Sequence, residues 1–112
     1  MLYYKLIKHP TSKEWTVFIH GAGGSSKVWF KQIRAFSENF NVLMLDLRGH
    51  GKSKNIKSPS NYSFEMIAED VVEVVRHNKI ERAHFIGVSL GSIVINQIQV
   101  THPEMVKSMV FS

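Results

Sequence analysis

The chain has 112 residues, 44% of them apolar, which predicts a single domain over residues 1–112, and no apolar run approaches the roughly 20 residues of a membrane-spanning helix. The absence of cysteine excludes disulfide scaffolds and thiolate chemistry, and fits a cytoplasmic protein. The formal net charge of +5 comes from scattered lysines and arginines, which predicts a solvated surface and no nucleic-acid partner.

Short apolar runs alternate with segments of helical period, which is typical of an α/β fold with a mostly parallel sheet and helices on both faces. The opening residues 2–8 mix tyrosine and lysine with aliphatic residues, and predict an antiparallel edge strand. Runs without alternation indicate strands covered on both faces. They predict four buried parallel strands, at 16–19, 42–45, 85–88 and 108–111.

Three helices are predicted between these strands. The first two carry apolar stripes that we assign to the core, namely Trp29, Phe30, Ile33 and Phe36, then Phe64, Ile67, Ala68, Val71 and Val75. Ser63 is the expected N-cap of the second helix, and Asn78 its stop. The third helix is expected to begin at Ser89 or Leu90 and to end near residue 102, because Pro103 cannot lie inside a helix. The polar residues 51–61 are expected to form a loop.

The junction between the third predicted strand and the third helix reads GVSLG over residues 87–91 and matches G-x-S-x-G. A sharp turn at this place would raise the Ser89 hydroxyl above the sheet edge. Such a turn strains the backbone of the central residue and brings the strand and helix close together. Gly87 and Gly91 supply the minimal side chains that this close approach requires.

Two further motifs follow the two preceding strands at their carboxyl ends, where open α/β sheets bind ligands. Residues 20–26 read HGAGGSS, a run of small residues that lets backbone N–H groups approach a substrate oxygen. Residues 46–53 read DLRGHGKS. Three motifs in this order are far more specific than the serine pattern alone.

With these motifs the sequence resembles the α/β-hydrolase superfamily, over about residues 4–112. Residues 20–23 resemble its HGxG oxyanion loop, residues 46–53 its DxRGxGxS turn, and residues 87–91 its nucleophile elbow. The resemblance implies a three-layer sandwich and a serine hydrolase that needs no cofactor or metal. It further implies Ser89 as nucleophile, with the backbone N–H groups of Ala22 and Leu90 as oxyanion hole.

The superfamily places its catalytic acid and histidine after the strand that follows the elbow helix. Beyond Ser89 this sequence has only Glu104 and His102 of these residue types, on the approach to the last strand and therefore at the wrong end of the sheet. We therefore expect the chain to be the N-terminal half of the fold. Hydrolysis of an ester or related acyl substrate would then require a C-terminal half.

Alternative roles exist for several of these residues. His20 and His50 lie at the site edge and are candidate bases, although the resemblance gives His20 the ordering of the oxyanion loop and His50 a structural turn. Asp46 is expected to bond backbone amides of its turn. His9, His77 and His84 are expected to be surface or packing residues, with no zinc-like spacing.

Other classes of site are also open. Residues 51–53 (GKS) match the end of a phosphate-binding loop, but Asp46 stands where its first glycine belongs, and residues 21–23 match only part of a dinucleotide fingerprint. Ser89 could be only a helix N-cap. Finally, the chain could be a catalytically incomplete unit that self-associates through the exposed edge of the last strand, residues 106–111.

Overall fold

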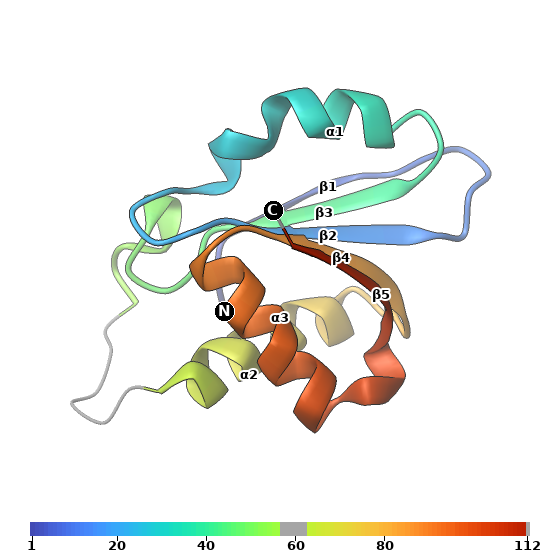
Figure 1. Cartoon of the computed structure of the whole chain (residues 1–112). Coiled ribbons are helices and arrows are strands. Elements are labelled where there is room, and N and C mark those ends of the chain that lie inside the picture. The colour runs from blue at the N-terminus through green and yellow to red at the C-terminus, as the bar shows by residue number, and fades with distance from the viewer. Residues whose placement is uncertain (57–62, 112) are drawn as a thin grey trace.

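A computed structural model describes residues 1–56 and 63–111 as a five-stranded sheet with helices on both faces (Figure 1). The strand order is β1-β3-β2-β4-β5, and β1 is antiparallel to β3 whereas all other pairs are parallel. The strands are β1 (Tyr4–Ile7), β2 (Trp15–Ile19), β3 (Asn41–Leu45), β4 (Ala83–Gly87) and β5 (Val106–Phe111). This arrangement confirms the predicted α/β class and the antiparallel edge strand.

The helices form the two outer layers. Figure 1 shows α1 (Phe30–Phe36) above the sheet, and α2 (Phe64–His77) and α3 (Leu90–Thr101) below it. Short 3-10 helices occupy Ser26–Trp29, Gly51–Ser53 and Pro103–Met105. Because β2, β3 and β4 are parallel, their carboxyl ends meet at one edge of the sheet, and all three sequence motifs begin there.

Local sequence explains where α2 begins and ends. The Ser63 hydroxyl accepts a hydrogen bond from the Met66 N–H at 3.3 Å, as an N-cap does. Glu65 lies in the first turn and Arg76 in the last, so both charges complement the helix dipole. Asn78 ends the helix with its backbone N–H and side chain both donating to the Val74 carbonyl. The predicted cap and stop are confirmed.

The sheet separates two apolar cores. The larger one lies between the sheet and α2 and α3, and includes Leu43, Leu45, Phe85 and Ile95, none of them measurably exposed. Burying each such side chain contributes about 1.5–3 kcal/mol. The smaller core lies beneath α1, where Phe18 packs against Trp29 with ring centroids 5.1 Å apart.

Several predicted details are wrong. Trp29 is buried but belongs to a 3-10 helix, and Phe30 at 67% and Phe64 at 50% exposure lie at helix starts and point outward instead of into the core. Strand β4 covers residues 83–87, so Val88 lies beyond it. Strand β5 is not covered on both faces, because it pairs only with β4 and its residues 107–111 are exposed.

The predicted loop at 51–61 begins with a 3-10 helix at Gly51–Ser53, and positions 57–61 lie outside the described residues. Among the helices that the structure describes, none combines the length and apolarity needed to cross a bilayer.

Candidate active site

Ser89 lies between the end of β4 and the start of α3, directly before Leu90, the first residue of α3. Its backbone has φ 54° and ψ −116°, a left-handed conformation that non-glycine residues rarely adopt and that costs of order 1–3 kcal/mol. The side chain is exposed and accepts no capping hydrogen bond from α3. The interpretation of Ser89 as a simple N-cap is therefore wrong, and the predicted strained turn is present.

The flanking glycines allow β4 and α3 to meet at this turn. A Cβ atom at Gly87 would lie 2.8 Å from the Gly91 carbonyl carbon and 2.6 Å from the Ile95 side chain. A Cβ atom at Gly91 would overlap the Ile19 carbonyl oxygen and lie 2.8 Å from the His20 carbonyl oxygen. Both positions therefore exclude any side chain, as the sequence motif predicts.

Two backbone amides near Ser89 are available to bind a ligand. Gly91 and Ser92 donate their N–H groups to the Val88 and Ser89 carbonyls, whereas the N–H groups of Leu90 and Ala22 have no acceptor in the described part of the chain. The α3 dipole adds partial positive charge at this end of the helix. The position therefore favours a negatively charged oxygen near Ser89.

The loop after β2 lies directly against the elbow. A Cβ atom at Gly21 would lie 3.1 Å from the Val88 carbonyl oxygen and 3.2 Å from Ser89 Cβ. The Val88 N–H donates to the Ile19 carbonyl at 3.4 Å. The first and third sequence motifs are thus in contact, and Ala22 is held one residue from this contact.

His20 holds this loop in place and cannot act as a base. Its Nδ1 lies 2.7 Å from the Gly21 carbonyl oxygen, so Nδ1 carries the proton, and its Nε2 accepts the Leu47 N–H at 2.9 Å. No lone pair remains for a substrate proton. Burial lowers the pKa of His20, and the bond to Gly21 offsets this only in part. The orienting role that the resemblance implies fits these contacts, and the candidate role as base is wrong.

The neutral form of His20 predicts a loss of stability in mild acid. Since its pKa is lowered on folding, the unfolded chain binds a proton first as the pH falls below the ordinary value of 6.5. The stabilising contribution is therefore present above pH 6.5 and lost as the pH falls through the folded-state pKa. Urea unfolding between pH 7 and 5 is expected to show a shallower pH dependence for His20→Gln than for the unmodified chain. A matched change at the exposed His77, His77→Gln, should leave the dependence in place; equal slopes for all three proteins would contradict the assignment.

Asp46 stabilises the turn that follows β3. Its carboxylate accepts the Ser26 N–H at 2.7 Å and the Lys52 N–H at 2.9 Å, which links this turn to the loop after β2. Burial by itself raises the pKa of Asp46, but the bonds from Lys52 and Ser26 outweigh it, and the pKa lies below its ordinary value. The Lys52 amide, which a phosphate bound to the 51–53 loop would need, is thus occupied by an internal carboxylate. The turn role is confirmed, and the phosphate-loop interpretation is wrong.

Arg48 anchors the same turn to α2, which the sequence reasoning missed. Its guanidinium donates to both carboxylate oxygens of Asp70, from Nε at 2.9 Å and from a terminal nitrogen at 2.8 Å. Nearby, the His50 Nδ1 donates to the Arg48 carbonyl at 3.0 Å, and the His50 and His20 rings lie 5.0 Å apart. The fixed DxR spacing was the only available signal for Arg48, and nothing in the sequence paired it with Asp70.

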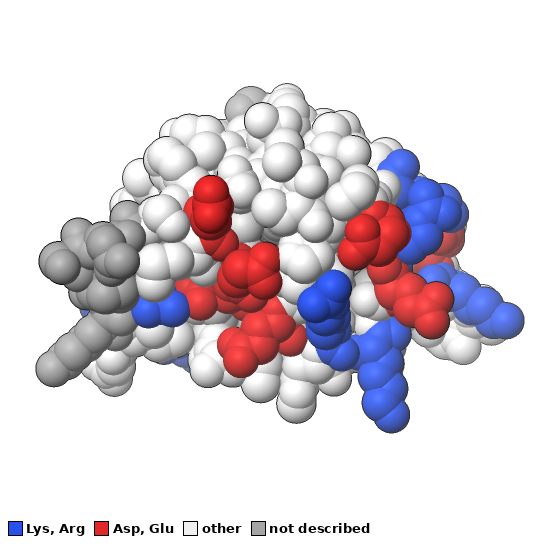
Figure 2. Space-filling view, turned by 90° about the horizontal axis from the view of Figure 1, so that it is seen from below, with Lys and Arg blue, Asp and Glu red and all other residues white. Residues whose placement is uncertain are grey.

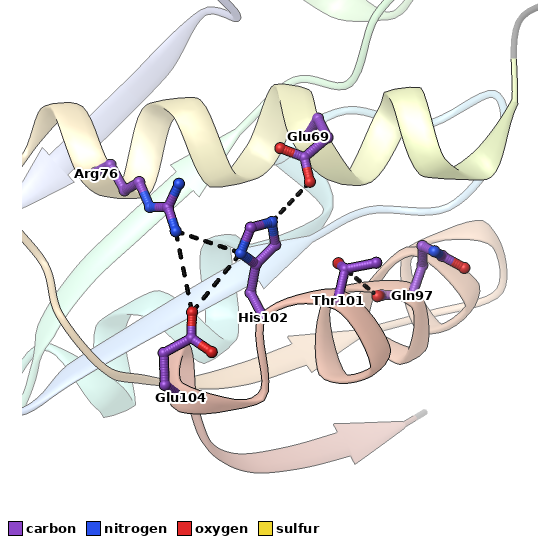
Figure 3. A network of polar contacts seen from close by, with 6 residues as sticks. All are labelled: Glu69, Arg76, Gln97, Thr101, His102 and Glu104. Atoms are coloured by element: carbon purple, nitrogen blue, oxygen red, sulfur yellow. Dashed lines mark hydrogen bonds and ion pairs between the residues drawn. The ribbon is translucent and has the colours of Figure 1, made fainter.

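His102 and Glu104 lie far from the elbow in the fold. Figure 3 shows His102 between Glu69 and Arg76 of α2, with its Nε2 2.7 Å from a Glu69 carboxylate oxygen and its Nδ1 3.7 Å from Glu104. Both residues precede β5, whereas Ser89 follows β4. Because β4 and β5 are parallel, these two sites are at opposite ends of the sheet. The expectation that neither serves Ser89 is confirmed.

The fold and the elbow together define the class. The chain belongs to the alpha/beta hydrolase fold family, whose model matches residues 15–112. This confirms the resemblance inferred from the three motifs.

Individual relatives are hydrolases of several kinds. The chain is 32% identical over 94 residues to the pimeloyl-[acyl-carrier protein] methyl ester esterase of Aeromonas hydrophila, covering 84% of this chain and 35% of that protein. Its structure resembles the enol-lactonase of Burkholderia xenovorans LB400, with 30% identity and a TM-score of 0.88 over 96% of this chain and 41% of the other. A hydrolase of Pseudomonas aeruginosa PA01 gives 31% identity and a TM-score of 0.87, covering 96% and 40%. The chain spans less than half the length of each of these relatives.

Proposed function

We propose that this chain carries the nucleophile and oxyanion hole of a serine hydrolase acting on a carboxylic ester or related acyl substrate. The observation that carries the proposal is Ser89, exposed and strained at the junction of β4 and α3. Its Oγ would attack the substrate carbonyl carbon, the alcohol would leave, and water would later release the acyl group. The esterase and lactonase named above support this substrate class.

The oxyanion hole would consist of the backbone N–H groups of Ala22 and Leu90. Ala22 lies on the loop after β2 and Leu90 is the first residue of α3, and neither N–H group has an acceptor within the described chain. Their positions are fixed by His20 and by the start of α3, so they need no rearrangement when negative charge develops. Such preorganised donors are worth on the order of 100-fold or more in turnover each.

The general base and its acid partner would come from a C-terminal half of the fold. His20 has no free lone pair, and His102 is bound to Glu69 at the other end of the sheet. The superfamily order places both groups after the strand that follows the elbow helix, which corresponds to β5. In this proposal residues 1–112 form one domain half, and by themselves they hydrolyse substrate slowly.

Labelling with a fluorophosphonate probe tests the proposal. Mass spectrometry is expected to find the adduct on Ser89 and not on Ser92, which donates its hydroxyl to the Gly87 carbonyl at 3.1 Å. Labelling of the 112 residues alone should be slow, and faster in a protein that includes the acid and histidine. An adduct confined to other residues would refute the nucleophile assignment, whereas rapid labelling of residues 1–112 would assign the base to His50 or to a second chain.

A second candidate function is self-association through β5. This strand pairs only with β4, and Val110 and Phe111 are 52% and 51% exposed, so the described chain presents an apolar strand edge. Sedimentation velocity should then show dimers that dissociate in Val110→Lys but persist in Val100→Lys, a change at a 71% exposed residue of α3. A monomer at every concentration would exclude this function.

A further inference from the structure

A groove of about 630 Å³ lies on the α1 side of the sheet, and no residue of the elbow contributes to it. Ile7 of β1 and Met44 of β3 contribute to its lining from the sheet, and Phe30 and Ile33 from α1. Small-molecule sites occupy roughly 300–1,000 Å³ and have mostly apolar linings, so both the size and the lining fit a small ligand.

The groove is also lined by four lysines, Lys5, Lys27, Lys52 and Lys54. In the part of the chain that the structure describes, no carboxylate forms an ion pair with any of them. The one acidic residue of the groove, Asp46, already accepts two backbone N–H groups. The Lys52 ammonium lies 4.8 Å from the centre of the Tyr3 ring, so three lysines, Lys5, Lys27 and Lys54, supply positive charge without an ion pair among the described residues.

Acidic residues are unevenly distributed along the chain and are scarce in the segment that supplies most of the groove. The only acidic residues between Trp15 and Phe64 are Glu38 and Asp46, whereas α2 alone carries Glu65, Glu69, Asp70 and Glu73. Figure 2 looks onto the side of α2 and α3, where acidic side chains gather among the basic ones. The groove faces the other side of the sheet, where the Asp46 carboxylate offsets only one of its four lysine charges.

We propose that this groove binds a medium-chain carboxylate, a molecule with one anionic head and one unbranched apolar chain. The carboxylate would lie among the ammonium groups, and the chain would cover Ile7, Met44 and Ile33. A small inorganic anion would leave the apolar surface in water, and a neutral alkyl compound would leave the charge unpaired. Only a ligand with both an anionic head and an apolar chain matches both the lysines and the apolar residues of the groove.

The groove is a separate site from the one proposed around Ser89. It is lined by Ser25 and Ser26, the last residues of the motif that begins at His20, but not by Ala22, Ser89 or Leu90. Binding there requires no general base and no acyl transfer. The inference therefore stands or falls independently of the hydrolase proposal.

Titration of the ¹⁵N-labelled protein with octanoate, acetate and 1-octanol tests the inference. Octanoate is expected to shift the amide signals of Ile7, Ser26 and Met44 in a saturable way that weakens with added salt. Acetate lacks the chain and 1-octanol lacks the charge, so neither should saturate these signals. Equal binding of 1-octanol, or octanoate shifts confined to residues 87–91, would overturn the proposal.

Paired charge variants locate the anionic head. Lys5→Gln with Lys27→Gln removes two exposed groove charges and should weaken octanoate binding about five- to ten-fold. Lys13→Gln with Arg82→Gln removes the same net charge from another surface hollow and should leave binding unchanged. All four side chains are exposed, and thermal unfolding of each variant checks that the fold is kept. Equal weakening by both pairs would show a general charge effect and would also overturn the proposal.

Discussion

Replacing Ser89 with glycine is expected to stabilise the fold and to remove the reactivity that we propose for this residue. At φ 54° any residue with a Cβ atom is strained, and glycine is not, so Ser89→Gly should raise the free energy of unfolding by about 1 kcal/mol. Ser89→Ala keeps the Cβ atom and should be close to neutral. Both variants should lose fluorophosphonate labelling, and in a protein with a complete triad turnover should fall on the order of 10⁴- to 10⁶-fold.

Ser92 provides the matched control for this prediction. Ser92 lies one turn further along α3, in ordinary helical backbone. The Ser92→Gly protein should therefore be about 1 kcal/mol less stable than the Ser92→Ala protein. This is the reverse of the order expected at Ser89. Chemical denaturation of the four variants measures both differences. If glycine is less stable than alanine at both positions, the strain assigned to Ser89 is wrong. If Ser89→Gly is stabilised but still labelled, the strain is real and the nucleophile is another residue.

The elements that follow from local pattern were predicted well. Residues 17–19 and 42–45 are apolar without alternation because helices cover both faces of the central strands, and the Ser63 cap and Asn78 stop depend on adjacent residues alone. The errors have a different origin. Phe30 and Phe64 fit apolar stripes, but each is the first residue of its helix and at least half of its surface is exposed. Exposure of β5 depends on its neighbours in the sheet, which its own sequence cannot specify.

In the candidate site, too, features set by adjacent residues were predicted, whereas contacts between distant residues were not. The strained turn at Ser89 and the exclusion of side chains at Gly91 follow from a five-residue motif, because they concern adjacent backbone. The contacts that hold the site together join distant residues: His20 accepts from Leu47, Asp46 accepts from Ser26, and Arg48 pairs with Asp70. Motif spacing marks such residues as special without identifying their partners. For this reason sequence reasoning left His20 open as a base, and the direction of its two hydrogen bonds decided the question.

Adding a single methyl group at Gly91 is expected to be the most damaging small change in the chain. Gly91 lies in the first turn of α3, where alanine would ordinarily stabilise a helix by up to about 1 kcal/mol. Here the new Cβ atom would overlap the Ile19 carbonyl oxygen and crowd that of His20, and backbone at the end of a central strand cannot yield as a flexible side chain can. Gly91→Ala should therefore cost about 3 kcal/mol or more, a large part of the stability of a small domain.

Gly23→Ala separates crowding from backbone conformation. Gly23 has φ 79° but nothing within 4 Å of an added Cβ atom, so its replacement should cost only about 1–2 kcal/mol. Thermal or urea unfolding compares the two variants directly, and a Gly91→Ala loss no greater than that of Gly23→Ala would contradict the close contact between α3 and β2. Because α3 must move away from β2 to accept the methyl group, the Leu90 amide moves away from Ala22 as well. Any Gly91→Ala protein that remains folded should therefore label more slowly at Ser89, which ties the tight packing of the elbow to the geometry of the proposed oxyanion hole.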